Sequence, residues 1–130
     1  MDLGLTGKVA LVTGGSEGIG KAAALSMVAE GAKATICARR EDVLNAAADE
    51  IRAATGGEVL AVTADVSTAE GVQKVIDATL SQFGRLDILV NNAAYRVGED
   101  RVPIIELDPD VFQTVMAVKV TGTFLCTKAA

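Results

Sequence analysis

A cluster of glycines near the start of the sequence has the residue types and the spacing of a phosphate-binding turn. The cluster runs from Thr13 to Gly20, after an apolar run expected to form a buried strand and before an alanine-rich run expected to form a helix. Glycine lets the backbone approach a ligand closely and adopt positive φ, and the first N–H groups of a helix lack intrahelical partners. Because the helix dipole is also positive there, the segment predicts a site for the pyrophosphate of a nucleotide.

The spacing of these glycines excludes two common nucleotide-binding motifs and matches a third. Gly-x-Gly-x-x-Gly does not fit, since Ala23 stands where its last glycine should be. A Walker A loop fails at Ala22, where a hydroxyl should hold Mg²⁺, so an NTPase-like protein is disfavoured. The pattern that fits is Thr-Gly-x-x-x-Gly-x-Gly, and in it the sequence resembles the short-chain dehydrogenase/reductase family of nicotinamide-dependent oxidoreductases. A turn that merely connects strand and helix is the alternative.

Composition and charge exclude several other classes of function. The 130 residues suit one domain, and the net charge of −5 argues against nucleic acid as a partner. No apolar run approaches the roughly 18 residues of a membrane span, and the N-terminus lacks the layout of a signal peptide. The sequence has no His, which excludes Ser-His and Cys-His nucleophiles and imidazole zinc sites, and we expect no metal. Cys37 and Cys126 form no CxxC pair, so we expect reduced core thiols in a cytoplasmic protein.

Four candidate strands alternate with helical segments along the chain. The strands begin near Lys8, Lys33, Val59 and Leu86, which are separated by 25, 26 and 27 residues. This alternation predicts βαβ units and a parallel sheet, and right-handed crossovers give the strand order 3-2-1-4. We therefore expect an α/β fold with a three-layer, Rossmann-type, doubly wound parallel sheet, truncated after its fourth strand and fourth helix. Residues 1–130 would form one incomplete NAD(P)-binding domain.

Local signals predict where the first three helices begin and end. Gly31 and Gly84 are expected to follow the last turns of the first and third helices. Ser67 and Glu70 have the spacing of a capping box at the start of the third helix. The apolar periodicity of that helix predicts that Leu80 is buried.

A fourth helix is expected to begin at Asp108 and Pro109 and to continue through Ala130, so we expect the sequence to stop in mid-element. This helix carries more apolar residues than a face bordered by water would. They are Val111, Val115, Met116, Val118, Val120, Phe124 and Leu125. In the resembling family this helix helps to form a subunit interface, which implies a homo-oligomer. For this chain we expect aggregation or a partner, since the fourth strand would also be an apolar sheet edge.

The residues at the end of the second strand bear on the choice of cofactor. The family places there a carboxylate that binds the ribose hydroxyls of NAD, and this sequence has Ala38 at that position. Arg39 and Arg40 follow, and guanidinium groups suit the 2′-phosphate of NADP. We therefore expect NADP(H) to be preferred, with NAD(H) possible if Glu41 holds a ribose. The arginines could instead be a solvated strand end, and Glu17 stands where many NADP-using relatives carry a basic residue.

Two further segments resemble cofactor contacts of the family. Asp65-Val66 follows the third strand, and the resemblance implies that they bind adenine, although Asp65 could be only a turn residue. Asn91-Asn92-Ala93-Ala94 follows the fourth strand and resembles Asn-Asn-Ala-Gly, with Ala94 in place of the glycine. The strand order would bring this segment to the glycine loop. The expected cofactor-binding residues are Gly14, Ser16, Glu17, Gly18, Ile19, Gly20, Arg39, Arg40, Asp65, Val66, Asn92, Ala93 and Ala94.

The proton-transfer residues of the family are not found in this sequence. The resembling enzymes use a serine and a Tyr-x-x-x-Lys, in which the lysine lowers the pKa of the tyrosine. The only tyrosine is Tyr95, which is followed four residues later by Glu99, and no serine follows Ser81. Lys119 stands at the position of the fourth catalytic residue, an asparagine in the family. We therefore expect no catalytic residue in this chain.

The resemblance implies an enzyme that transfers a hydride between NADP(H) and an alcohol or carbonyl substrate. This chain would carry its cofactor-binding part and would be inactive alone, with the catalytic half absent. A non-catalytic nucleotide-binding module is the alternative. The substrate is not identified by the sequence. Residues from Arg96 to Arg101 either line the entrance to a substrate pocket or form an ordinary solvated loop, which we favour.

Overall fold

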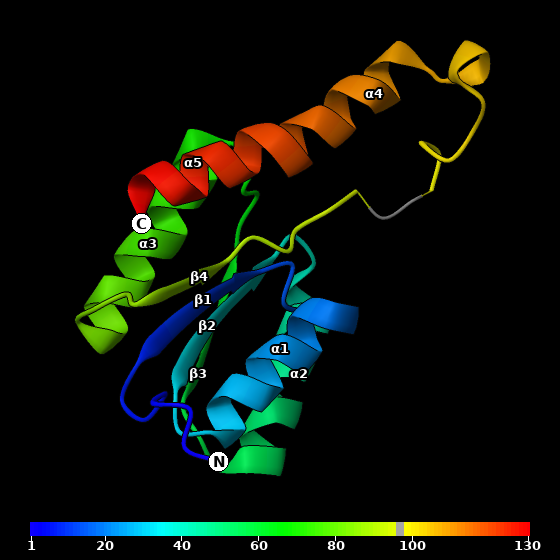
Figure 1. Cartoon of the computed structure of the whole chain (residues 1–130). Helices are drawn as coiled ribbons and strands as arrows, with labels where there is room; N and C mark the ends of the chain where they lie inside the picture. The colour runs from blue at the N-terminus through cyan, green and yellow to red at the C-terminus, as the bar shows by residue number, and fades with distance from the viewer. Residues whose placement is uncertain (96–97) are drawn as a thin grey trace.

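A parallel four-stranded sheet lies between two layers of helices in the computed structural model, which describes residues 1–95 and 98–130 (Figure 1). The strands are β1 (Val9–Thr13), β2 (Lys33–Ala38), β3 (Val59–Thr63) and β4 (Ile88–Val90). They are hydrogen-bonded in the order β3-β2-β1-β4, and every pair is parallel. The predicted α/β fold and its strand order are therefore confirmed.

The fourth strand is shorter than the sequence predicts. The expected strand begins at Leu86, whereas β4 begins at Ile88. Asp87 explains the difference, because its carboxylate Oδ2 accepts a hydrogen bond from the N–H of Val9 at 2.9 Å, while its own N–H donates to the carbonyl of Val9 at 2.9 Å. A side-chain oxygen thus takes the place of a strand carbonyl at this end of the pairing with β1.

Helices α1 (Gly18–Ala29) and α2 (Glu41–Thr55) cover one face of the sheet, and α3 (Ala69–Phe83) and α5 (Gly122–Ala129) cover the other (Figure 1). Side chains alternate between the faces of a strand. Val12 and Ile36 accordingly pack toward α1 and α2, and Leu11 packs toward α3 and α5. Burial on both faces is the reason that these strands are continuous apolar runs.

Both cysteines belong to the core on the α3 and α5 side, and both are free thiols. Burial raises the pKa of Cys37 to about 12, and neighbouring Cys126 adds to the rise. Burial also raises the pKa of Cys126. Each thiol is therefore protonated at neutral pH, which makes it a poor nucleophile and a structural side chain.

The predicted capping box of the third helix is wrong by one residue. Thr68 is the N-cap of α3, and its hydroxyl oxygen accepts a hydrogen bond from the N–H of Gly71 at 3.0 Å. The hydroxyl of Ser67 instead donates to Asp65. The predicted helix ends at Gly31 and Gly84 agree with the structure.

The predicted burial of Leu80 is also wrong, since this side chain is 45% exposed. The hydroxyl of Thr79 bonds to that of Thr35 on β2 at 2.9 Å, in the buried layer between helix and sheet. Successive residues are about 100° apart around a helix, so Leu80 is turned toward the rim of α3 when Thr79 points inward.

The predicted fourth helix is one continuous rod with a change of geometry in its middle. It comprises α4 (Pro109–Met116), a π-helical stretch (Ala117–Thr121) and α5. The predicted start is confirmed, because the carboxylate of Asp108 accepts a hydrogen bond from the N–H of Asp110 at 2.8 Å. The sequence did not predict the π-helical stretch.

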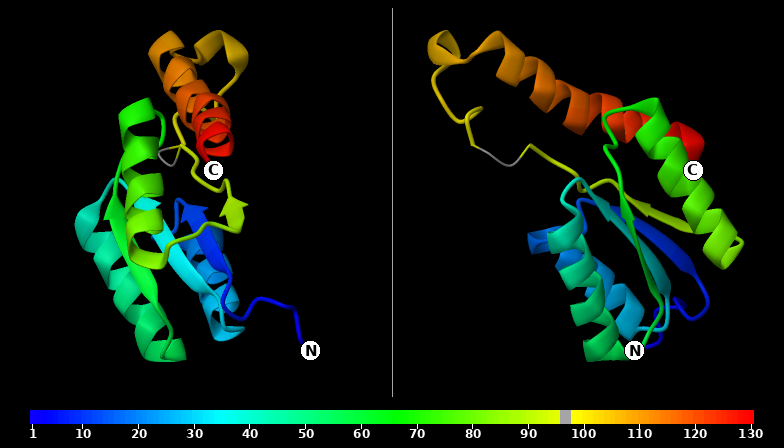
Figure 2. Two further views of the ribbon diagram at one scale, coloured as in Figure 1. Left: turned by 90° about the vertical axis from the view of Figure 1, so that its left-hand side faces the viewer. Right: turned by 180° about the vertical axis from the view of Figure 1, so that it is seen from behind.

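The two halves of this rod have different surroundings. Gly122 and Cys126 are buried where α5 packs on α3, whereas none of the described residues of α4 is buried. Figure 2 shows α4 reaching past the edge of the sheet, with a short 3₁₀ helix (Ile104–Glu106) before it. Within the described residues, every helix is too short or too polar to cross a membrane.

The core between α2 and the sheet offers a direct test of the packing. Leu44 is 0% exposed, so we expect Leu44→Ala in the full chain to lower the free energy of unfolding by about 2–5 kcal/mol. Leu80→Ala is the matched control, for which we expect a loss of less than about 1 kcal/mol. Urea denaturation measures both values, and equal losses would contradict this assignment of the core.

Candidate nucleotide site

The carboxyl ends of the four strands meet at one edge of the sheet, where the predicted site residues lie. The glycine loop follows β1, Arg39 and Arg40 follow β2, Asp65 follows β3, and the segment from Asn91 follows β4. Since β1 lies between β2 and β4, its glycine loop is flanked by segments from both neighbours. This edge, at the point where the strand order reverses, is where open α/β sheets bind ligands.

The glycine loop packs tightly against the segment after β4. Gly14 has a φ of +65°, and a Cβ added to it would lie 2.9 Å from the Cα of Ala93. A Cβ on Gly20 would lie 2.4 Å from the side-chain nitrogen of Asn92 and 2.4 Å from the carbonyl oxygen of Gly14. These contacts require glycine at both positions, which explains part of the motif without reference to a ligand.

Hydrogen bonds hold these two segments together. The side chain of Asn92 donates to the carbonyl of Gly14 at 3.1 Å. The hydroxyl oxygen of Thr13 accepts from the N–H groups of Asn92 and Ala93, each at 3.0 Å, and the hydroxyl donates to the carbonyl of Val90 at 3.4 Å. The sequence analysis assigned no role to Thr13, although Thr13 is the first residue of the Thr-Gly-x-x-x-Gly-x-Gly pattern, which was a usable signal.

The start of α1 is open in the way that a bound anion requires. The side chain of Glu17, the N-cap residue, pairs with Arg40 rather than capping its own helix, and the first turn contains no acidic residue. Gly18 has a φ of +56°, and among the described residues no atom outside its own backbone surroundings lies within 4 Å of an added Cβ. The backbone therefore presents the positive end of the helix to open space, and these residues fit a pyrophosphate.

The other two predicted residues of this turn differ in exposure. Ser16 is buried at 8% exposure, whereas Ile19 is 82% exposed on the first turn of α1. An apolar side chain so open to solvent at the mouth of the loop leaves a surface that a bound nucleotide could cover.

The two arginines after β2 lie in different surroundings. Arg40 pairs with Glu17, with 2.7 Å between the guanidinium Nη2 and the carboxylate Oε1. Arg39 is exposed, and its charge helps to lower the pKa of Asp65. The sequence pattern could not reveal this pairing, because Glu17 and Arg40 are 23 residues apart in the chain.

Asp65 is fixed by a turn of its own. Its Oδ1 accepts hydrogen bonds from the N–H of Ser67 at 2.9 Å and from the hydroxyl of Ser67 at 2.6 Å. The hydroxyl contact is the main reason that the pKa of Asp65 is lowered. The carboxylate is therefore ionised at neutral pH. The neighbouring Val66 is buried, and its carbonyl lies close to Gly122 of α5.

Tyr95 is not set up for proton transfer near neutral pH. Its hydroxyl donates to the carboxylate of Glu99 at 2.9 Å, and this hydrogen bond is the main reason that its pKa is raised. A tyrosine that exchanges a proton near neutral pH needs a lowered pKa instead. Of the loop expected near a substrate entrance, Arg96 and Val97 lie outside the described residues, and Arg101 is exposed.

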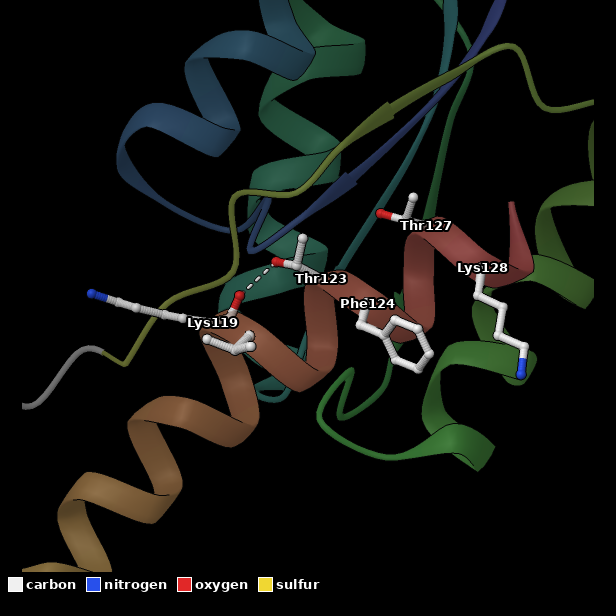
Figure 3. Close-up of a pocket in the computed structure, with 6 residues that line it drawn as sticks. Lys119, Thr123, Phe124, Thr127 and Lys128 are labelled. Carbon is white, nitrogen blue, oxygen red and sulfur yellow. Dashed lines mark hydrogen bonds between the residues drawn. The ribbon is translucent and has the colours of Figure 1, made fainter.

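A hollow lies elsewhere on the described surface. It has a volume of about 510 Å³ and lies along the rod formed by the π-helical stretch and α5 (Figure 3). Its lining residues are Lys119, Val120, Thr123, Phe124, Thr127 and Lys128. The carbonyl of Lys119 accepts a hydrogen bond from the hydroxyl of Thr123 at 2.7 Å. Because all of the lining comes from one helix, this is a surface hollow and not a cleft between elements.

A parallel sheet in the order 3-2-1-4, with a glycine loop at its switch point, defines the Rossmann class of folds. Comparison with protein families identifies the family within this fold class. The family model of the short chain dehydrogenases matches residues 8–130. The chain therefore belongs to the short-chain dehydrogenase/reductase family of oxidoreductases.

Individual relatives include both reductases and dehydrogenases. Over 126 residues the chain is 44% identical to a 3-oxoacyl-[acyl-carrier-protein] reductase of Synechocystis, a match that covers 96% of this chain and 49% of that protein. It superimposes with a TM-score of 0.89 and 37% identity on L-sorbose reductase from Gluconobacter frateurii, solved with NADPH and L-sorbose, covering 99% of this chain and 48% of that one.

An NAD⁺-bound xylitol dehydrogenase has the same TM-score of 0.89, at 34% identity, with coverage of 96% of this chain and 47% of that one. The chain thus spans about half the length of these relatives. One solved relative holds NADPH and the other holds NAD⁺. The comparisons therefore support a nicotinamide cofactor without deciding between the two forms.

The contact between Thr13 and the segment after β4 can be tested by removing one hydroxyl. Thr13→Val in the full chain keeps the side-chain shape but leaves the N–H groups of Asn92 and Ala93 without their acceptor. We expect the free energy of unfolding to fall by about 1–3 kcal/mol and these two amides to exchange faster with solvent. Thr114→Val, which removes an exposed hydroxyl bonded within α4, is the control. Unchanged exchange of the two amides, measured by NMR, would refute the role given to Thr13.

Proposed function

We propose that this chain forms the cofactor-binding part of an oxidoreductase that transfers a hydride between NADP(H) and an alcohol or carbonyl compound. The observation that carries the proposal is the open start of α1 beside the contact between Gly14 and Asn92. That arrangement offers backbone N–H groups to a pyrophosphate at the switch point of the sheet. Membership of the short-chain family supports the same conclusion.

Each part of the site would hold a different part of the dinucleotide. The bound nicotinamide supplies the carbon that accepts or donates the hydride. In our assignment the loop holds the pyrophosphate through its backbone, with Gly14, Ser16, Glu17, Gly18, Ile19 and Gly20 as its members. Asp65 and Val66 hold the adenine. Asn92, Ala93 and Ala94 border the cofactor beside β4, and the bonds of Asn92 to Gly14 and Thr13 keep that border fixed.

Hydride transfer is accompanied by the transfer of a proton, which requires an acid–base group. The described residues of the chain do not offer one. Tyr95 has a raised pKa, and Lys119 is a cation in the π-helical stretch, where the family has an asparagine. We therefore propose that residues other than 1–130 supply the proton and that residues 1–130 alone are inactive.

The two cysteines bear on the cellular compartment. Both are free, buried thiols, which suit a reducing compartment, and we propose the cytoplasm.

The preference for NADP(H) is supported by the end of β2. Ala38 cannot repel a 2′-phosphate, and the exposed guanidinium of Arg39 can bind one. NAD(H) remains the second candidate, since xylitol dehydrogenase was solved with NAD⁺ at a TM-score of 0.89 to this chain.

Binding measurements on the full chain test this assignment. We expect NADPH to bind more tightly than NADH, and we expect Arg39→Ser to weaken NADPH binding by about two- to fivefold, because one exposed charge pair is lost. NADH binding should change by less than about twofold. Arg85→Ser is the matched control, since Arg85 pairs with Asp87 at the opposite end of the strands. Equal affinity of the wild type for NADH and NADPH would overturn the preference.

A turnover assay distinguishes an enzyme from a binding module. We expect residues 1–130 alone to leave NADPH unoxidised. We expect a protein that joins them to the residues supplying the proton to oxidise NADPH in the presence of at least one member of a panel of ketones and aldehydes, followed by the loss of cofactor absorbance. Tight binding of NADPH by that protein without turnover across the panel would favour the non-catalytic module.

We also propose that the helical rod from α4 to α5 joins two copies of the chain. Its exposed apolar residues repeat every four positions, and they are Phe112, Met116, Val120 and Phe124, between 40% and 61% exposed. The hollow shown in Figure 3 lies on the same rod. Contiguous exposed apolar surface of this kind is typical of an association site.

A charged substitution on the rod tests the association. We expect Phe124→Glu in the full chain to reduce the mass of the particle measured by light scattering, because a desolvated carboxylate would oppose contact. Leu3→Glu places the same charge on a residue that is 54% exposed in the N-terminal segment, and it should leave the mass unchanged. A monomeric wild type, or an unaltered mass for Phe124→Glu, would contradict the proposal.

A further inference from the structure

One edge of the sheet is formed by β3, which among the described strands pairs with β2 alone (Figure 1). Its sequence is Val-Leu-Ala-Val-Thr, which contains neither a charged residue nor a proline. A short apolar strand with free N–H and C=O groups along one side is a template for pairing with another strand. Because β3 itself lacks the charges and prolines that commonly prevent such pairing, protection of this edge has to come from other elements.

Backbone hydrogen bonds show which residues of β3 face away from the sheet. The N–H of Ala34 donates to the carbonyl of Glu58 at 3.1 Å, and the N–H of Ala64 donates to the carbonyl of Ala38 at 3.0 Å. Successive residues of a strand direct their backbone groups to opposite sides, so the even-numbered residues of this segment bond to β2. The residues that direct their backbone groups outward are therefore Val59, Ala61 and Thr63.

Two cations from different helices bind the outward carbonyls at the two ends of β3. The guanidinium of Arg52, on α2, donates to the carbonyl of Val59 from Nε at 3.2 Å and from Nη2 at 2.5 Å. The ammonium of Lys74, on α3, donates to the carbonyl of Thr63 at 2.6 Å. Since α2 and α3 cover opposite faces of the sheet, the edge is covered from both sides.

These two contacts leave little of the edge for another strand. Only Ala61 directs backbone groups outward between the two occupied carbonyls, whereas a strand usually pairs over about five residues. An incoming strand would have to displace both cations, and hydrogen bonds from a charged donor are stronger than those between neutral groups. The two side chains also place positive charge along the line that the N–H groups of a new strand would follow.

We propose that Arg52 and Lys74 prevent β3 from pairing with the β3 strand of a second copy of the chain. A second copy is the relevant partner because its own β3 has the same apolar sequence and the same outward backbone groups. Two identical edges are self-complementary when they are related by a two-fold axis. The two cations thus oppose association through the sheet, which is separate from the contact proposed for the helical rod.

Light scattering of the full chain tests this role. Arg52→Met combined with Lys74→Met keeps an apolar stem at both positions and removes both donors. We expect the initial rate of association to rise by at least about tenfold, because two hydrogen bonds from charged donors no longer oppose pairing.

The matched control removes one lysine and one arginine that lie on other elements. Lys21 on α1 pairs with Glu50, and Arg85 pairs with Asp87 before β4. Lys21→Met combined with Arg85→Met therefore gives the same net charge and the same two added methionines. We expect this control to change the rate by less than about twofold.

A proline at Ala61 shows where the copies join. The N–H of Ala61 faces outward, so Ala61→Pro removes a donor that a second strand needs without removing a hydrogen bond to β2. Added to the Arg52→Met, Lys74→Met protein, it should return the rate to within about twofold of the wild type. Phe124→Glu, added instead, should leave the rate raised, because that side chain lies on the helical rod.

Three results would overturn the role given to the two cations. They are an unchanged rate in the Arg52→Met, Lys74→Met protein, an equal rise in the matched control, and a raised rate that Ala61→Pro does not lower. If urea denaturation shows that the double variant is partly unfolded, Lys74→Met alone decides, since Lys74 is an exposed residue. We expect this single variant to raise the rate by about threefold, and an unchanged rate would equally overturn the proposal.

Discussion

The contact between the glycine loop and the segment after β4 is the interaction on which the rest of the site depends. Thr13 offers one hydroxyl oxygen to two successive N–H groups, and Asn92 returns a bond to the carbonyl of Gly14. A side chain at Gly14 or Gly20 would collide with this segment. The loop is therefore shaped by its neighbour before any ligand arrives, and the first turn of α1 has neither a side-chain cap nor an acidic residue. Such preorganisation reduces the entropy lost on binding.

Much of this arrangement could be predicted from the sequence because the strands of a parallel sheet have a simple sequence pattern. Apolar runs at near-regular intervals define the strands, and the handedness of crossovers then fixes their order. The position of the site follows, since Gly14 and Asn92 end neighbouring strands. The predictions that were wrong concern details that depend on single polar contacts. Thr79 turned α3 so that Leu80 faces the rim, and Asp87 replaced a strand carbonyl beside Val9.

The charged residues of the sequence did not reveal which of them are paired in the fold, and this pairing decides which charges are available to a ligand. Two consecutive arginines predict an anion site, but the pattern assumes that both guanidinium groups are available. In the folded chain Arg40 already has a carboxylate partner, while Arg39 is exposed and influences Asp65. No periodicity in the sequence relates Glu17 to Arg40, because only the packing of α1 beside α2 brings them together. Pairings of this kind are settled by tertiary structure, and they change the chemistry that a motif can offer.

The π-helical stretch between α4 and α5 has a geometric consequence for the whole rod. A π-helical turn holds one more residue than an α-helical turn, so Ala117–Thr121 acts as a phase shift within a continuous helix. A chain one residue shorter in this stretch could be α-helical throughout, and α4 would keep nearly the same orientation relative to α5, because the wider π-helical turn takes up the additional residue. The contact of Gly122 with the carbonyl of Val66 would hold α5 in place. The π-helical stretch thus lets the rod carry one additional residue without turning the side chains of α4 to another face.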